Sequence, residues 1–140
     1  QAEDTFLSMM TDNKFKSQVQ KYLTKWRRKL RLDDWRIKLV IVQENYATRH
    51  GESGSVYGST EVQTELKCAL IKIAEPGTDR VALAELEATV VHELLHLHFD
   101  LYPWGEDATR DRLMEQTVDC LAICLIKTDN PEWVDPRANV

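Results

Sequence analysis

The sequence predicts an α+β fold in which one helix precedes a small three-stranded sheet and two helices follow it. Three observations predict this order: an amphipathic segment near the start, three short β-type runs in the middle, and two long helical runs toward the end. Because 140 residues is the length of one domain, we expect a single domain over residues 1–140.

The first predicted helix covers residues 14–30, and Thr11 and Asp12 are both suitable caps for its start. Residues 14–31 carry eight Lys or Arg and no Asp or Glu, although the net charge of the chain is -5. The basic residues flank an apolar stripe, which favours a solvated helix face over a nucleic-acid-binding surface. The stripe has the three- and four-residue spacing of a helix and consists of Phe15, Val19, Tyr22, Leu23, Trp26 and Leu30.

Three strands are predicted next, at residues 35–43, 55–62 and 66–73. The second strand is shorter and more polar, so we expect it at an edge of the sheet. Residues 79–99 form a long run that is apolar on most sides, which indicates a helix through the middle of the core. The last helix is predicted at residues 108–126, with Asp107 as its cap.

No apolar run is long enough to cross a bilayer, so we expect no membrane association. The three cysteines, Cys68, Cys120 and Cys124, are odd in number and lack the CxxC spacing of a zinc cluster. This predicts reduced thiols in an intracellular protein. We also expect a cytoplasmic location and a monomer. Cys120 and Cys124 share one helix face, where we expect ordinary core packing.

The motif that carries chemistry is HELLH at residues 92–96, an HExxH pattern inside the predicted central helix. Residues four apart on a helix are separated by about 40° around its axis, so both imidazoles can reach one metal at roughly 2.0 to 2.1 Å. Glu93 sits about 100° round from His92, where it can contact a water molecule on the metal. The pattern indicates a zinc site with Glu93 as the general base.

Thr89, His92 and His96 form a polar stripe on an otherwise apolar helix, and a metal would satisfy it. Zinc in a catalytic site usually takes three ligands from the protein. Glu115, nineteen residues after His96 on the last predicted helix, is the expected third ligand. Asp119, one turn further on, would accept a hydrogen bond from a ligand histidine and fix its ring.

Two other residues near the motif, Asp100 and His98, could compete as ligands. Asp100 is an alternative third ligand if the helix frays there, but its placement is less favourable than that of Glu115. His98 lies about 160° from His96 around the helix, and a cation at a helix end suits the helix dipole. We therefore leave His98 out of the site.

The combination of HExxH on one helix and ExxxD on the next resembles the gluzincin metallopeptidases, and the order of elements over residues 14–126 is similar to minigluzincins and SprT-like proteases. The resemblance implies a zincin-like fold, with His92, His96 and Glu115 as zinc ligands and Glu93 as catalytic base. It also implies that Asp119 accepts a hydrogen bond from a ligand histidine and that the polar strand docks substrate. Larger gluzincins use a later histidine to stabilise the oxyanion. This chain has none after His98, which leaves Tyr102 as a candidate.

The function expected from the sequence is a zinc-dependent metallopeptidase that hydrolyses peptide bonds in a peptide or protein substrate, with a zinc-activated water and Glu93 as general base. The alternative is a zinc-stabilised module without catalysis that contacts nucleic acid through the basic helix at residues 14–31. Salt-sensitive retention on DNA through Lys21, Lys25, Arg27 and Arg28 would favour this alternative.

Overall fold

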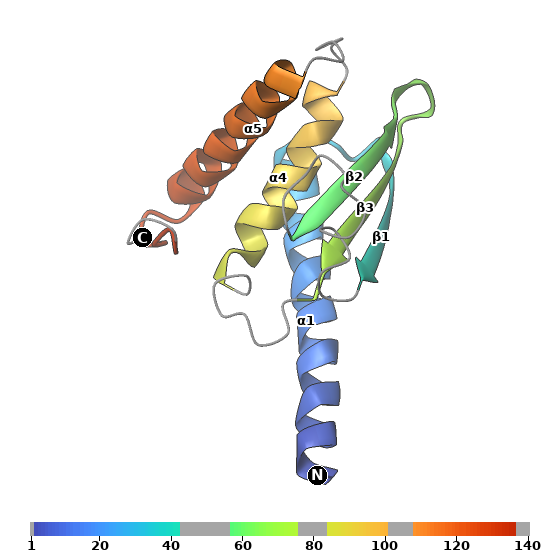
Figure 1. The fold of residues 1–140 in the computed structure, drawn as a ribbon, viewed down its shortest axis with the longest axis vertical. Coiled ribbons are helices and arrows are strands. Elements are labelled where there is room, and N and C mark those ends of the chain that lie inside the picture. The colour runs from blue at the N-terminus through green and yellow to red at the C-terminus, as the bar shows by residue number, and fades with distance from the viewer. Residues whose placement is uncertain (1, 43–56, 76–83, 101–107, 137–140) are drawn as a thin grey trace.

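The computed structural model describes residues 2–42, 57–75, 84–100 and 108–136, with side chains from Asn13 onward in the first range and from Asp111 onward in the last. Within these ranges it is an α+β fold of three helices and a three-stranded mixed sheet (Figure 1). The elements follow in the order α1 (Ala2–Lys29), β1 (Arg36–Val42), β2 (Gly58–Gln63), the 3-10 helix η1 (Thr64–Leu66), β3 (Cys68–Ala74), α4 (Leu86–Phe99) and α5 (Ala108–Asp129). The predicted class and order of elements are confirmed.

Several predicted boundaries are wrong. The first helix begins at Ala2, so Thr11 and Asp12 lie inside it and do not cap it. No Gly or Pro occurs in residues 2–13, so no residue there interrupts the helix. The last helix continues to Asp129, one residue before the Asn-Pro pair at 130–131. Residues 43, 55–56 and 79–83 and the predicted cap Asp107 lie outside the described residues.

The sheet has the order β1-β3-β2, with β1 parallel and β2 antiparallel to the central strand. The polar strand β2 is therefore at an edge, as predicted. Alternation along β3 buries Ala69, Ile71 and Ile73 on the face toward the helices. Thr60 of β2 is paired with Ile71, which places it on the same inner face.

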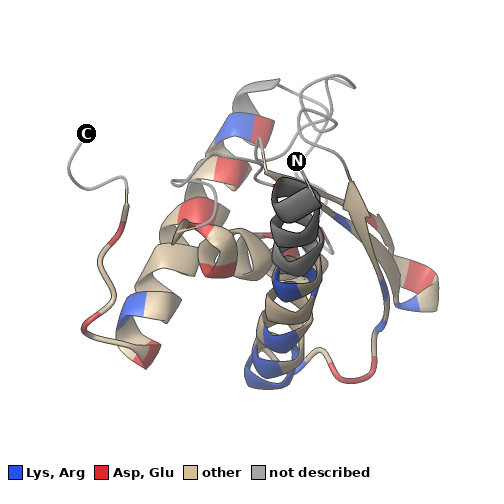
Figure 2. Cartoon of the chain, turned by 90° about the horizontal axis from the view of Figure 1, so that it is seen from below, with Lys and Arg blue, Asp and Glu red and all other residues tan. Residues whose placement is uncertain are grey.

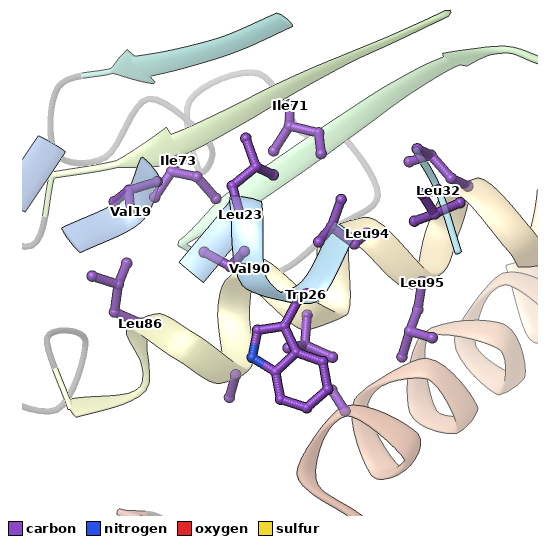
Figure 3. Packing of buried hydrophobic residues seen from close by; sticks show 14 of the residues in the cluster. Val19, Leu23, Trp26, Leu32, Ile71, Ile73, Leu86, Val90, Leu94 and Leu95 are labelled. Carbon is purple, nitrogen blue, oxygen red and sulfur yellow. The ribbon is translucent and has the colours of Figure 1, made fainter. Parts of the chain in front are cut away.

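The core lies between that face of the sheet and the helices (Figure 3). Val19, Leu23 and Trp26 of α1 pack with α4 and with the inner side chains of β3. Every residue of α4 from Leu86 to Leu97 is buried except Glu87, because α1, the sheet and α5 surround it. The expectation of a central helix is confirmed, and α5 lies against α4 on the side away from the sheet (Figure 1).

Charged side chains of α1 form ion pairs with both α4 and α5. Lys25 Nζ lies 3.0 Å from Glu87 Oε1 of α4 and 2.7 Å from Asp129 Oδ2 of α5. Lys29 Nζ lies 3.1 Å from Asp129 Oδ1. Several Lys and Arg residues lie along the described part of α1 (Figure 2), and two of them, Lys25 and Lys29, form ion pairs with carboxylates of the chain itself.

None of the helices in the described ranges is both long and apolar enough to span a membrane.

The expectation that Cys120 and Cys124 pack in the core is wrong, because both are exposed. Helix α5 buries only one face against α4, through Val118, Ala122 and Ile126. The opposite face, which carries the two cysteines, is exposed in the described part of the chain. None of the three cysteines forms a disulfide.

Candidate metal centre

The two histidines of the HExxH motif lie one turn apart on α4 and are both buried, with 4% and 5% of their surface exposed. The centroids of the His92 and His96 rings are 5.2 Å apart, and the ring planes are tilted by 59°. Both imidazoles reach the same carboxylate on α5. The helical spacing therefore brings the two Nε2 atoms to one place, as the sequence predicted.

Glu115 is the residue of α5 that bridges these imidazoles. Its Oε2 lies 2.9 Å from His92 Nε2, and its Oε1 lies 2.9 Å from His96 Nε2. One ligand atom from each of the three residues falls within 4.8 Å of the others. The structure thus brings together all three residues that the sequence proposed as ligands, and the cluster could hold a metal ion.

Zinc needs a particular spacing of its ligand atoms. Tetrahedral ligands at about 2.0 to 2.1 Å from zinc are about 3.3 Å from one another. The two observed contacts of 2.9 Å are a few tenths of an ångström shorter, because nitrogen and oxygen are now in hydrogen-bond contact. Two imidazoles and one carboxylate also match the donor set of catalytic zinc sites that leave one position for water. The donor set suits a zinc ion, and the ligand atoms, which lie within 4.8 Å of one another, would move to a spacing of about 3.3 Å to hold it.

A carboxylate lies behind each imidazole. Asp119 Oδ1 is 3.4 Å from His92 Nδ1. The sequence predicted that Asp119 would lie beside a ligand histidine and orient its ring. Asp100 Oδ1 is 3.3 Å from His96 Nδ1. The alternative that Asp100 frays from the helix to become a ligand is wrong, because its backbone N–H donates to His96 O at 2.8 Å and continues the turn. Asp100 is within hydrogen-bond geometry of His96 Nδ1, whereas Asp119 makes only an ion-pair contact with His92 Nδ1.

Glu93 is fully buried beside the ligand cluster. Its Oε2 accepts a hydrogen bond from the Thr60 hydroxyl at 2.6 Å. Its Oε1 lies 4.0 Å from His92 Nε2 and has no hydrogen-bond partner among the described residues. One oxygen of the carboxylate is therefore held by β2, while the other lies near a ligand atom.

The charges of the cluster shift the pKa of each member. Burial lowers the pKa of His92, but contacts with Asp119 and Glu115 outweigh it and raise the value to about 9. Burial likewise lowers the pKa of His96, and Asp100 and Glu115 raise it to about 10. Burial raises the pKa of Glu115, but the two imidazoles lower it to about 2. The neighbouring carboxylates thus favour the protonated form of both imidazoles, and a metal ion that binds them has to displace the proton from Nε2.

The pKa of Glu93 moves in the opposite direction to that of Glu115. Burial raises the pKa of Glu93, and this exceeds the lowering by His92, His96 and the Thr60 hydroxyl. A carboxyl group with a raised pKa accepts and returns a proton more readily near neutral pH than an ordinary glutamate.

Two residues of β2 at the site were missed by sequence reasoning. Thr60 contacts Glu93, and Gly58 packs against the same side chain. The sequence showed only a polar strand, since the pairing register that turns Thr60 inward is not visible in it. Tyr102, the candidate for stabilising an oxyanion, lies outside the described residues.

No protein-family model, curated protein or solved structure matches this chain in comparisons with known proteins. The interpretation of the cluster therefore depends on its own geometry.

Proposed function

We propose that this protein is a zinc-dependent metallopeptidase with a zincin-like fold of the gluzincin type, acting on a peptide or protein substrate. The support comes from the order of elements and from the donor set. A buried helix supplies His92 and His96, the next helix supplies Glu115, and an edge strand lies beside them.

The observation that carries the proposal is the environment of Glu93. Burying a carboxylate completely is costly, and such a group is kept only where surrounding groups compensate for its lost hydration. Here Thr60 holds Oε2, while Oε1 lies 4.0 Å from the ligand nitrogen of His92 without a hydrogen-bond partner among the described residues. A core residue with no role beyond packing has no reason to keep a carboxylate in this position. A general base needs an unpartnered oxygen there.

Zinc held by His92, His96 and Glu115 would supply a water molecule of lowered pKa and would polarise the scissile carbonyl group. In this role Glu93 would take up a proton through Oε1 when water adds to the carbonyl carbon of the substrate. It then delivers the proton to the amide nitrogen as the C–N bond breaks. The products are one new carboxylate and one new ammonium group, which together account for both protons of the water. Asp119 and Asp100 keep the two imidazoles turned toward Glu115 throughout.

The test compares wild type with Glu93→Gln in a generic peptide-cleavage assay, after zinc loading and measurement of the bound metal. We expect the variant to keep one zinc per chain and to lose about 100-fold to 10,000-fold in turnover, the range that a general base contributes. Glu65→Gln is the matched control, because Glu65 is an exposed glutamate in η1. Normal turnover by Glu93→Gln would refute its role as base.

The same variant separates the proposal from a zinc-stabilised module without catalysis. The burial of Glu93 beside the cluster favours this second candidate if Oε1 serves as a fourth ligand. In that case Glu93→Gln would lose zinc affinity, and the wild type would cleave no peptide. Contact with nucleic acid through residues 14–31 has less support, because Lys25 and Lys29 are paired with carboxylates of the chain. Arg27 donates to the carbonyl groups of Leu32 and Asp33.

A further inference from the structure

The edge strand β2 contacts the carboxylate of the proposed base through the Thr60 hydroxyl group. Thr60 faces inward because it is paired with Ile71, whose side chain is in the core. Its Oγ1 lies 2.6 Å from Glu93 Oε2 and 3.3 Å from the backbone oxygen of Glu93. A hydroxyl has one proton to donate, and the shorter contact to a carboxylate is the stronger of the two. Thr60 therefore donates to Oε2.

The approach of β2 to Glu93 also depends on Gly58. A Cβ atom at this position would lie 3.2 Å from Glu93 Cγ and 3.1 Å from the backbone oxygen of Lys72. Both distances are tighter than ordinary van der Waals contact, and the second involves the backbone of the central strand. Only glycine allows the strand and the glutamate side chain to lie this close without displacement.

These contacts give the two carboxylate oxygens of Glu93 different surroundings. Rotation about the last bond of a glutamate side chain is broad, so packing of the stem alone does not fix the carboxylate plane. The Thr60 hydroxyl holds Oε2 toward the sheet, which leaves Oε1 on the side of His92. An oxygen misplaced by about 1 Å in a proton-transfer step can cost on the order of 100-fold in rate.

We propose that Thr60 is a positioning residue that fixes the carboxylate of Glu93 so that Oε1 faces the ligand cluster, with Gly58 providing the space for this contact. The inference rests on the proposed peptidase function and extends it to the strand outside the motif. Thr60 acts through Glu93, and it does not contact the three ligand residues in any recorded interaction of the described chain.

The first experiment measures kcat and KM for wild type, Thr60→Val and Thr60→Ser. Valine has nearly the shape of threonine but lacks the hydroxyl, so we expect kcat to fall by about 10-fold or more while KM changes by less than about twofold. Serine keeps the hydroxyl and should restore most of kcat. Ser59→Ala is the control, because Ser59 is the buried neighbour on the same strand that faces the other side of the sheet. All variants should bind zinc like wild type.

A double-mutant comparison shows whether Thr60 acts through Glu93. In a Glu93→Gln background the further change Thr60→Val should have almost no effect on the residual rate, because the carboxylate to be positioned is absent. Gly58→Ala supplies an independent variant if Thr60→Val folds poorly, and it should also lower kcat with little change in KM. Urea unfolding of the zinc-loaded proteins identifies any variant that is simply unstable.

Each outcome decides the inference. A Thr60→Val protein with the kcat of wild type would overturn it while leaving the peptidase function intact. A Thr60→Ser protein as slow as Thr60→Val would also overturn it, because the hydroxyl would then be irrelevant. Equal effects of Thr60→Val in the presence and absence of the Glu93 carboxylate would have the same consequence. If wild type shows no zinc-dependent cleavage, the peptidase function and this inference both fail.

Discussion

His96 and Glu115 face each other across the interface of α4 and α5, with 2.9 Å between Nε2 and Oε1. Together with the contacts of His92 with Glu115 and Asp119, this joins two helices that also share apolar contacts. A metal ion that replaces these hydrogen bonds would connect the same two helices by coordination. The stability of the protein should therefore report on the metal directly.

Removal of the metal is the first test. We expect one zinc per chain and a melting temperature that falls when a chelator removes it, because a ligand that binds only the folded state stabilises that state. At a concentration of 100 times Kd the effect is about 2.7 kcal/mol. Calorimetric melting with zinc and with EDTA measures this difference. The variant Glu115→Ala should show almost no difference, and an equal response of that variant would contradict the assignment of the third ligand.

The effect of zinc should also depend on pH. The folded-state pKa values of His92 and His96 are raised to about 9 and about 10, so their contribution to the metal-free protein is fully present below about pH 6.5. It is lost as the pH rises through the raised values. Zinc binds the neutral imidazoles and must displace the protons. The gain in melting temperature on adding zinc should therefore be larger at about pH 8 than at about pH 6.

Calorimetric titration in buffers of different ionisation enthalpy checks the same point, because zinc binding near neutral pH should release protons to the buffer. Release of no protons would show that the imidazoles are already neutral in the metal-free protein. The His96→Ala variant is the control, since it lacks one of the two protons.

Asp100 and Asp119 should affect metal affinity. Each carboxylate lies 3.3 to 3.4 Å from the Nδ1 atom of a ligand histidine, where it orients the ring and favours the tautomer that presents Nε2 to the metal. We expect Asp100→Asn and Asp119→Asn each to weaken zinc binding by about 10-fold to 100-fold. Competition with a chromophoric chelator measures the affinity. Asp34→Asn is the control, because Asp34 is exposed and is paired with Lys67 away from the cluster. If Asp100→Asn binds zinc as tightly as wild type, only Asp119 orients a ligand histidine.

Glu87 should matter for stability without affecting the metal. Its Oε1 accepts hydrogen bonds from Trp26 Nε1 at 2.8 Å and from Lys25 Nζ at 3.0 Å. Trp26 is buried, so Glu87→Ala leaves its N–H without this acceptor and should cost about 1 to 3 kcal/mol. The Lys25 contact is partly exposed and contributes less. Glu87→Gln keeps an acceptor for Trp26 and should lose less stability than Glu87→Ala. Urea unfolding compares the two, and equal losses would assign the effect to the charge.

Local patterns in the sequence predicted the elements and the three candidate ligands. The spacing of His92 and His96 fixes their common direction as soon as the segment is helical, and this depends only on nearby residues. The same holds for Glu115 and Asp119 on α5. The three candidate ligands could therefore be named from the sequence, although only the packing of α4 on α5 brings them together.

Features that depend on packing between distant segments were not predicted. Thr60 reaches Glu93 only because β2 pairs with β3 in one register, and a shift by one residue would turn it to the other face. The exposure of Cys120 and Cys124 depends on how many layers cover α5, which the spacing of residues within one helix does not reveal. The spacing of four between His96 and Asp100 was visible, but the contact at Nδ1 depends on the helix continuing to Asp100.

The two ends of α5 are held in different ways. Near its end, Asp129 forms ion pairs with Lys25 and Lys29 of α1, whereas the polar contacts nearer the start of α5 join Glu115 and Asp119 to the imidazoles. Loss of the ion should therefore weaken the packing of α5 on α4 around Glu115, while the end of α5 at Asp129 stays in place. Amide hydrogens around residues 115–119 would then exchange with solvent faster in chelated protein, while those near residue 126 would keep their protection.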